Sequence, residues 1–216
     1  MIFNYNNDYN LIIIMIATRI TSELSKNIDN LNDLFIKCHK IYKQIPPAKN
    51  ENKFAFGILV QMSLIECLHK SFHKCIDLDD DHEFGSEYKN DCCLFLDEST
   101  KVNLSIKAKS KKNGNIIIIN NYTSKIERDL SDLITIVVII ENNTIVIIPH
   151  SIVDTKFVIN SDANISYRGS LITHMLSNNP ELTIKLTQND KFESFISHEL
   201  PTIKPKNIFK GLFSDL

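Results

Sequence analysis

The spacing of hydrophobic residues changes about a third of the way along the chain, and this change predicts two kinds of structure. In the first third, apolar residues recur at intervals of three and four, as on one face of a helix. We therefore expect helices over residues 9–26, 31–45 and 53–76. Pro46 and Pro47 end the second of these, because proline cannot continue a helix.

The middle of the chain carries short apolar runs separated by polar turns, which is typical of strands. The expected strands cover residues 92–96, 102–109, 116–119, 133–140 and 144–148. Asn113 and Gly114 form a strong hairpin-turn signal before the third strand, and residues 123–131 fit a short helix. The run 133–140 is apolar apart from Thr135, which indicates a central strand buried on both faces.

Beyond residue 150 the pattern is weaker. It allows strands at 156–159 and 165–167 and helices at 169–176 and 191–197. No internal repeat and no long linker divides the chain, so residues 1–216 are expected to form one domain. The element order predicts an α/β or α+β fold, a mixed sheet flanked by helices. The sequence then has three parts: a helical region at 1–76, a sheet-bearing core at 90–150 and a mixed region at 151–216.

Composition narrows the classes of function. The 216 residues carry a net charge of −2, so a nucleic-acid binder with this sequence must gather its positive charge locally. Five cysteines without a C-x-x-C pair indicate reduced thiols and a cytoplasmic protein. The apolar run 11–17 is about a third of a membrane span, so we expect a buried helix and no membrane partner.

The candidate chemistry lies at Asp91 and Lys107. Asp91 precedes the first expected strand and Lys107 lies within the second, so a hairpin can bring them to one point. A carboxylate and an ammonium group placed together can hold a divalent cation and a phosphate. The plainer alternative is a turn-capping aspartate and a solvated lysine. His69, His73 and Cys75 have a spacing that can bind zinc, but no fourth ligand is in register.

The region 53–149 resembles the PD-(D/E)xK nuclease superfamily, type II restriction endonucleases in particular. The shared order is a helix, an acidic loop, an Asp-led strand, a lysine-bearing strand, a helix and a buried strand. Asn90-Asp91 stands where Pro-Asp is usual, and Ser105-Ile106-Lys107 stands where an acid-x-Lys triplet is usual. The resemblance implies a Mg²⁺ ion held by Asp91 and the Ile106 carbonyl, with Lys107 orienting or deprotonating the attacking water.

Ser105 departs from the family pattern, because a neutral hydroxyl replaces the second carboxylate. Three interpretations remain open. Glu127 in the following helix can supply the carboxylate, as in restriction enzymes with a Ser-x-Lys triplet. Glu66 on the third helix can supply it instead. In the third interpretation the site is inactive and the protein only binds DNA.

The resemblance implies a type II restriction endonuclease that cuts both strands of a short double-stranded DNA site and acts as a homodimer. Rival functions are a repair or junction-resolving nuclease and an inactive DNA-binding protein on the same fold. The N-terminal helices are candidates for the dimer surface or for clamping DNA. Candidate DNA contacts are Lys109, Lys111, Lys112 and Asn113 beside the site, and Tyr167 and Arg168 in a possible reading loop.

Overall fold

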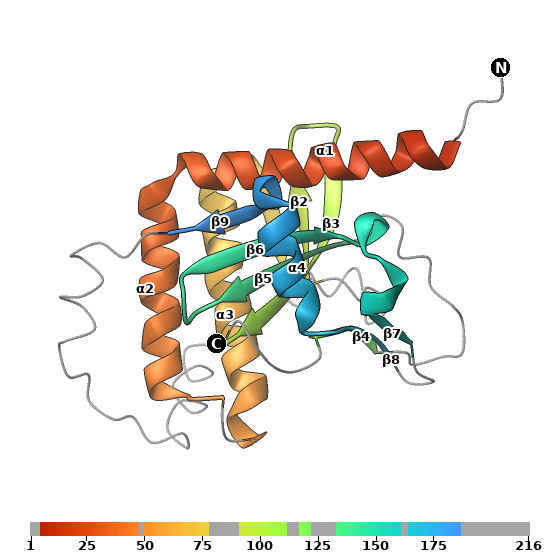
Figure 1. Cartoon of the computed structure of the whole chain (residues 1–216). Coiled ribbons are helices and arrows are strands. Elements are labelled where there is room, and N and C mark those ends of the chain that lie inside the picture. The colour runs from red at the N-terminus through yellow and green to blue at the C-terminus, as the bar shows by residue number, and fades with distance from the viewer. Residues whose placement is uncertain are drawn as a thin grey trace.

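The computed structural model describes residues 5–47, 50–77, 91–111, 117–121, 133–160 and 164–186. Within these ranges the protein is a mixed α+β structure, in which a six-stranded sheet is flanked by helices (Figure 1). The helices are α1 (Tyr5–Lys26), α2 (Ile28–Gln44), α3 (Asn50–Ser71) and α4 (Ser170–Asn178). The coarse fold class expected from the sequence is thus confirmed.

The main sheet has the strand order β1-β2-β3-β5-β6-β9. Its strands are β1 (Lys74–Asp77), β2 (Cys92–Phe95), β3 (Lys101–Lys109), β5 (Ile134–Ile139), β6 (Thr144–Pro149) and β9 (Thr183–Lys185). The pairing of β3 with β5 is parallel and the other pairings are antiparallel. Every residue of β5 and β6 is buried, so the apolar run identified in the sequence does lie at the centre of the sheet.

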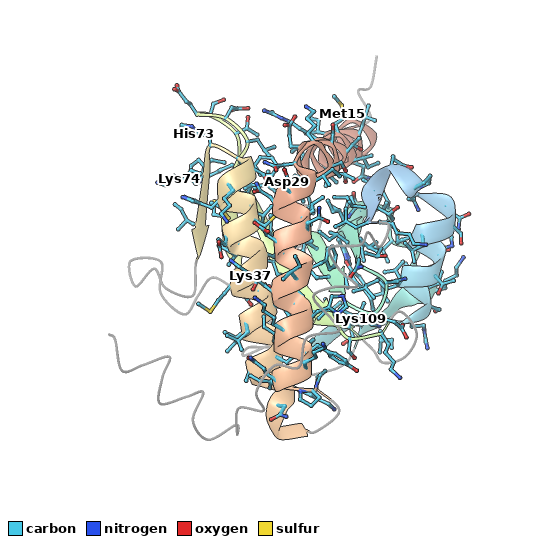
Figure 2. All side chains as sticks on the ribbon, turned by 90° about the vertical axis from the view of Figure 1, so that its left-hand side faces the viewer. Met15, Asp29, Lys37, His73, Lys74 and Lys109 are labelled. Atoms are coloured by element: carbon cyan, nitrogen blue, oxygen red, sulfur yellow. The ribbon has the colours of Figure 1, made fainter. Side chains whose placement is uncertain are left out.

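Helices cover both faces of this sheet. In Figure 1, α4 lies in front of the strands and α3 behind them, and the side view of Figure 2 separates the same two layers. The helix α3 contacts β1 and β3, while α4 contacts β6 and α1 crosses one end of the strands. None of the described helices is long and apolar enough to cross a membrane.

The helix α2 packs beside α3 and closes the end of the sheet where β5 turns into β6. His39 Nε2 lies 2.8 Å from Asn143 Oδ1 in that turn. Asn143 has a φ of 49°, the left-handed conformation that a tight turn requires and that Asn tolerates better than most residues. This contact ties α2 to the sheet end.

Two strands differ from the sequence-based expectation. The predicted helix 53–76 ends at Ser71, and Lys74–Asp77 forms the edge strand β1, which pairs with β2. The strand β4 (Ile117–Asn121) does not fold back on β3 as the Asn-Gly turn predicts. Long-range pairing overrides the local signal in both cases.

A second, three-stranded sheet has the order β4-β8-β7, with β7 at Val158–Asn160 and β8 at Asn164–Tyr167. The strand β4 pairs with β8, and the expected strands near 156–159 and 165–167 correspond to β7 and β8. The strand β9 was not predicted, because three residues carry too little pattern. The predicted helices 123–131 and 191–197 lie outside the described residues.

Candidate active site

The candidate site lies where β2 separates from β3. The first half of β3 pairs with β2, up to Leu104, and its second half pairs with β5, from Leu104 to Lys109. Beyond Leu104 no described strand pairs with the edge of β3 that faces β2, and we call this stretch the open edge. Asp91 precedes β2 and its backbone N–H donates to the Leu104 carbonyl at 2.9 Å, which brings its side chain to the open edge.

Three donors converge on one oxygen of the Asp91 carboxylate. Oδ2 accepts hydrogen bonds from Ser105 Oγ at 3.1 Å, from Lys107 Nζ at 3.2 Å and from the backbone N–H of Ile106. The other oxygen, Oδ1, makes no hydrogen bond to a described residue. The Asp91 side chain is 18% exposed and that of Lys107 is 27% exposed, so the pair lies partly below the surface but within reach of a ligand.

Strand geometry explains this arrangement. Side chains two residues apart share a face, so Ser105, Lys107 and Lys109 lie on one face of β3. The N–H and C=O of one extended residue point toward the same edge, so the Ile106 carbonyl faces the open edge with its N–H. Burial decreases along this face, from the fully buried Ser105 to the half-buried Lys109. Burial lowers the pKa of the Lys109 ammonium group.

The oxygen atoms at this point fit one side of a Mg²⁺ site. The Asp91 carboxylate and the Ile106 carbonyl offer oxygen atoms beside this edge, and Mg²⁺ commonly takes one or two carboxylates, with water and phosphate completing its shell. Among the residues that the structure describes, no group of three or more His, Cys, Asp or Glu side chains is clustered to hold a metal. The described part of the chain therefore supplies a single carboxylate at this point.

The structure does not bring Glu66 to this carboxylate. Glu66 lies on the seam between α3 and α2, where it pairs with Lys37 and, at 2.8 Å, with Lys70. These two ammonium groups lower the pKa of Glu66 to about 2. Glu66 makes no polar contact with Asp91 or Lys107. The other candidate for the second carboxylate, Glu127, lies outside the described residues.

The expected DNA-contacting residues fall in different environments. Lys109 is half-buried, and Lys111 is exposed beyond the end of β3. Arg168 is exposed and its Nε donates to the Lys156 carbonyl at 3.0 Å. Lys112 and Asn113 lie outside the described residues.

Tyr167 differs from the expectation that it contacts DNA. Its side chain is fully buried, and its hydroxyl lies 2.9 Å from His150 Nδ1. Burial raises the pKa of the phenol. The physical reason is the position of β8, because Ile165, Ser166 and Tyr167 are all buried and exposure begins only at the next residue, Arg168.

Sequence reasoning overlooked the role of Ser105 as a partner of Asp91. It treated the hydroxyl only as a missing acid, although a serine two residues before Lys107 had to share its strand face. The zinc alternative finds no support within the described ranges, because Cys75 lies in β1 opposite Leu94 and no metal-binding cluster includes it.

Comparisons with family models, with curated proteins and with solved structures found no match to this chain. Functional inference therefore depends on the geometry of Asp91, Ser105, Ile106 and Lys107.

Proposed function

We propose that the protein is a Mg²⁺-dependent endodeoxyribonuclease of the PD-(D/E)xK type, and specifically a type II restriction endonuclease that cuts both strands of a short DNA site. The observation that carries this proposal is the convergence of the Asp91 carboxylate, the Ile106 edge and the Lys107 ammonium at the point where β2 leaves β3. A phosphodiesterase site needs an anionic metal ligand and a nearby cation, and these residues are such a pair.

In this mechanism Asp91 and the Ile106 carbonyl would hold Mg²⁺. The bound ion would make a water nucleophilic at neutral pH and stabilise the leaving oxygen. Lys107 Nζ lies 3.2 Å from Asp91 Oδ2. Its flexible side chain can turn to the scissile phosphate, where its charge offsets the developing negative charge and its N–H groups orient the attacking water.

Ser105 has a supporting task in the same scheme. Its buried hydroxyl and the Ile106 N–H both hold Oδ2 of Asp91, so the carboxylate keeps one orientation and Oδ1 makes no hydrogen bond to a described residue. Lys109 and Lys111 continue outward from Lys107 in one direction and would contact backbone phosphates on one side of the cut. Such contacts position DNA without reading its sequence.

The direct test is incubation of a large unmodified DNA with the purified protein, with Mg²⁺ or with EDTA. Discrete Mg²⁺-dependent fragments support a restriction endonuclease, and smearing supports a nonspecific or structure-selective nuclease. Asp91→Asn and Lys107→Met should each reduce the cleavage rate by a hundredfold or more, roughly the loss seen when one charge-stabilising group is removed. Glu23→Gln and Lys26→Ala are matched controls, because they remove an exposed acid–lysine pair on α1. Full activity in either site variant would refute the assignment.

A second candidate is a DNA-binding protein without catalytic activity. The observation that favours it is the serine at position 105, where a second metal-binding acid is usual in the family that the chain resembles. Intact DNA under all divalent-ion conditions, together with salt-dependent DNA binding, would support this candidate over the nuclease.

A further inference from the structure

One face of the sheet carries a row of basic side chains across β1, β2 and β3. The strand register places Lys74 opposite Phe95, and Phe95 opposite Lys101, so these three side chains are neighbours on one face. Lys107 lies further along the same face of β3, because side chains two residues apart share a face. The side chains that alternate with them, such as Leu94, belong to the core. We call Lys74, Phe95 and Lys101 the lysine row.

The positive charge of the lysine row is not neutralised within the described part of the chain. Lys74 and Lys101 are exposed, and neither forms an ion pair with a described residue. Lys74 Nζ lies 5.3 Å from the centre of the Phe95 ring, and this cation–π contact holds it at the outer edge of the molecule (Figure 2). Burial raises the pKa of the Cys93 thiol, and Lys101 and Lys74 both oppose this rise, so the two ammonium groups lie near the same side chain.

Acidic residues near the lysine row are few in the described strands. In the turn between β2 and β3, Asp97 pairs with Arg19 at 3.2 Å and Glu98 is exposed. The connection between β1 and β2, residues 78–90, contains further acids but lies outside the described residues. On this face of the three strands, the charged side chains that the structure describes are Lys74, Lys101, Lys107, Lys109 and, just before β2, Asp91.

We propose that the lysine row binds the phosphate backbone of duplex DNA, on the side of the cut opposite to Lys109 and Lys111. Along β3, Lys107 lies between Lys101 and Lys109, so a duplex that follows this strand meets basic side chains on both sides of the candidate site. At about 3.3 Å per residue, Lys101 and Lys109 are about 26 Å apart. This distance corresponds to about eight base pairs of duplex at about 3.4 Å each. The inference rests on the proposed function, because the position of Lys107 is what favours DNA over another polyanion.

The test is the salt dependence of DNA binding, measured by titration of a labelled duplex in EDTA so that no cleavage occurs. Each phosphate contact contributes about −0.9 to the slope of log K against log salt concentration. Lys74→Gln with Lys101→Gln should therefore make this slope shallower by about 2, whereas Lys74→Arg with Lys101→Arg should keep it. Lys53→Gln with Lys185→Gln is the matched control, because it removes the same charge from exposed lysines on α3 and on β9, at the other edge of the sheet.

The control should bind with the wild-type slope, and thermal unfolding checks that every variant is folded. An unchanged slope in the Lys74→Gln and Lys101→Gln variant, or an equal loss in the control, would overturn the proposal. Duplex RNA that binds more tightly than duplex DNA, and loses affinity in the same variant, would replace DNA as the occupant of the lysine row.

Cleavage in Mg²⁺ separates failure of this inference from failure of the proposed function. A surface that only holds the backbone affects binding, so the Lys74→Gln and Lys101→Gln variant should raise KM for DNA and leave kcat unchanged. Wild-type cleavage with an unchanged salt slope in this variant refutes the lysine row and leaves the nuclease proposal standing. Weakened binding in the variant, with no cleavage by the wild-type protein, supports the surface and refutes the nuclease. A wild-type protein that binds no DNA at any salt concentration refutes both.

Discussion

Replacing Asp91 by alanine should weaken the fold, whereas replacing it by asparagine should largely spare it. The Asp91 carboxylate is the acceptor for Ser105 Oγ, the Ile106 N–H and Lys107 Nζ. Alanine leaves the Ser105 hydroxyl and the Ile106 amide without their acceptor. Asparagine presents a carbonyl oxygen at the same position and removes only the charge.

The magnitude follows from burial. A buried hydrogen-bond donor left unpaired costs about 1–3 kcal/mol. Asp91→Ala leaves two donors unpaired, the Ser105 hydroxyl and the Ile106 N–H, and Ser105 is fully buried. We expect that variant to lose about 2–4 kcal/mol of the free energy of unfolding. Asp91→Asn loses the ion pair with Lys107, which is 27% exposed, so its loss should be about 0.5–1 kcal/mol.

The assay is urea unfolding at neutral pH, followed by circular dichroism, with equal m-values as the check that only stability has changed. Lys107→Met removes the same ion pair from the other side and should match Asp91→Asn in stability. If Asp91→Ala and Asp91→Asn unfold at the same urea concentration, the carboxylate does not hold Ser105 and Ile106, and the reasoning fails. The comparison also identifies Asp91→Asn as the variant for cleavage assays, because lost activity in it cannot be attributed to unfolding.

Three further outcomes are expected. Asn143→Ala should lose about 2 kcal/mol of the free energy of unfolding, since it removes the His39 contact and places alanine at a φ of 49°. Asn143→Gly should lose about 1 kcal/mol less, because glycine adopts this φ without strain. Equal melting temperatures of the two variants would contradict the role of φ. Tyr167→Phe should cost about 1 kcal/mol through the lost His150 contact and leave DNA affinity unchanged in a binding titration, whereas a large affinity loss would show that Tyr167 contacts DNA. The pKa of Glu66 is lowered to about 2 in the folded protein. Its contribution to folding stability is therefore fully present above its unfolded pKa and is lost as the pH falls toward 2. Glu66→Gln should therefore cost less than about 1 kcal/mol at pH 7, because Glu66 is 46% exposed, and a cost that persists at pH 2 would contradict this cause.

Much of the central fold could be predicted from the sequence. The run that became β5 is apolar apart from Thr135 and has no polar side to expose, which favours a central position in the sheet. The meeting of Asp91 and Lys107 was also predictable, because a short polar turn between two strands makes them neighbours. The residue-by-residue register of β2 against β3 was not predicted, so the contact between Ser105 and Asp91 was missed.

Elements that depend on distant partners could not be predicted. Residues 74–77 continue a helical pattern, and only pairing with β2 makes them a strand. The strand β4 follows a strong hairpin signal, yet it pairs with β8, which lies far along the chain. Tyr167 is an ordinary surface candidate in the sequence, and the position of β8 over the core decides that it is buried.

The sequence by itself determined the periodicities, the central strand and the presence of an acid and a lysine on adjacent strands, because these depend on residues close together in the chain. The tertiary structure decided which edge of β3 is open, which oxygen of Asp91 is held and that Glu66 is occupied by Lys37 and Lys70. It also decided that Leu11, Ile12 and Met15 of α1 face outward, although they are apolar. The physical reason is that burial and hydrogen-bond partners depend on packing between segments, which local periodicity does not encode.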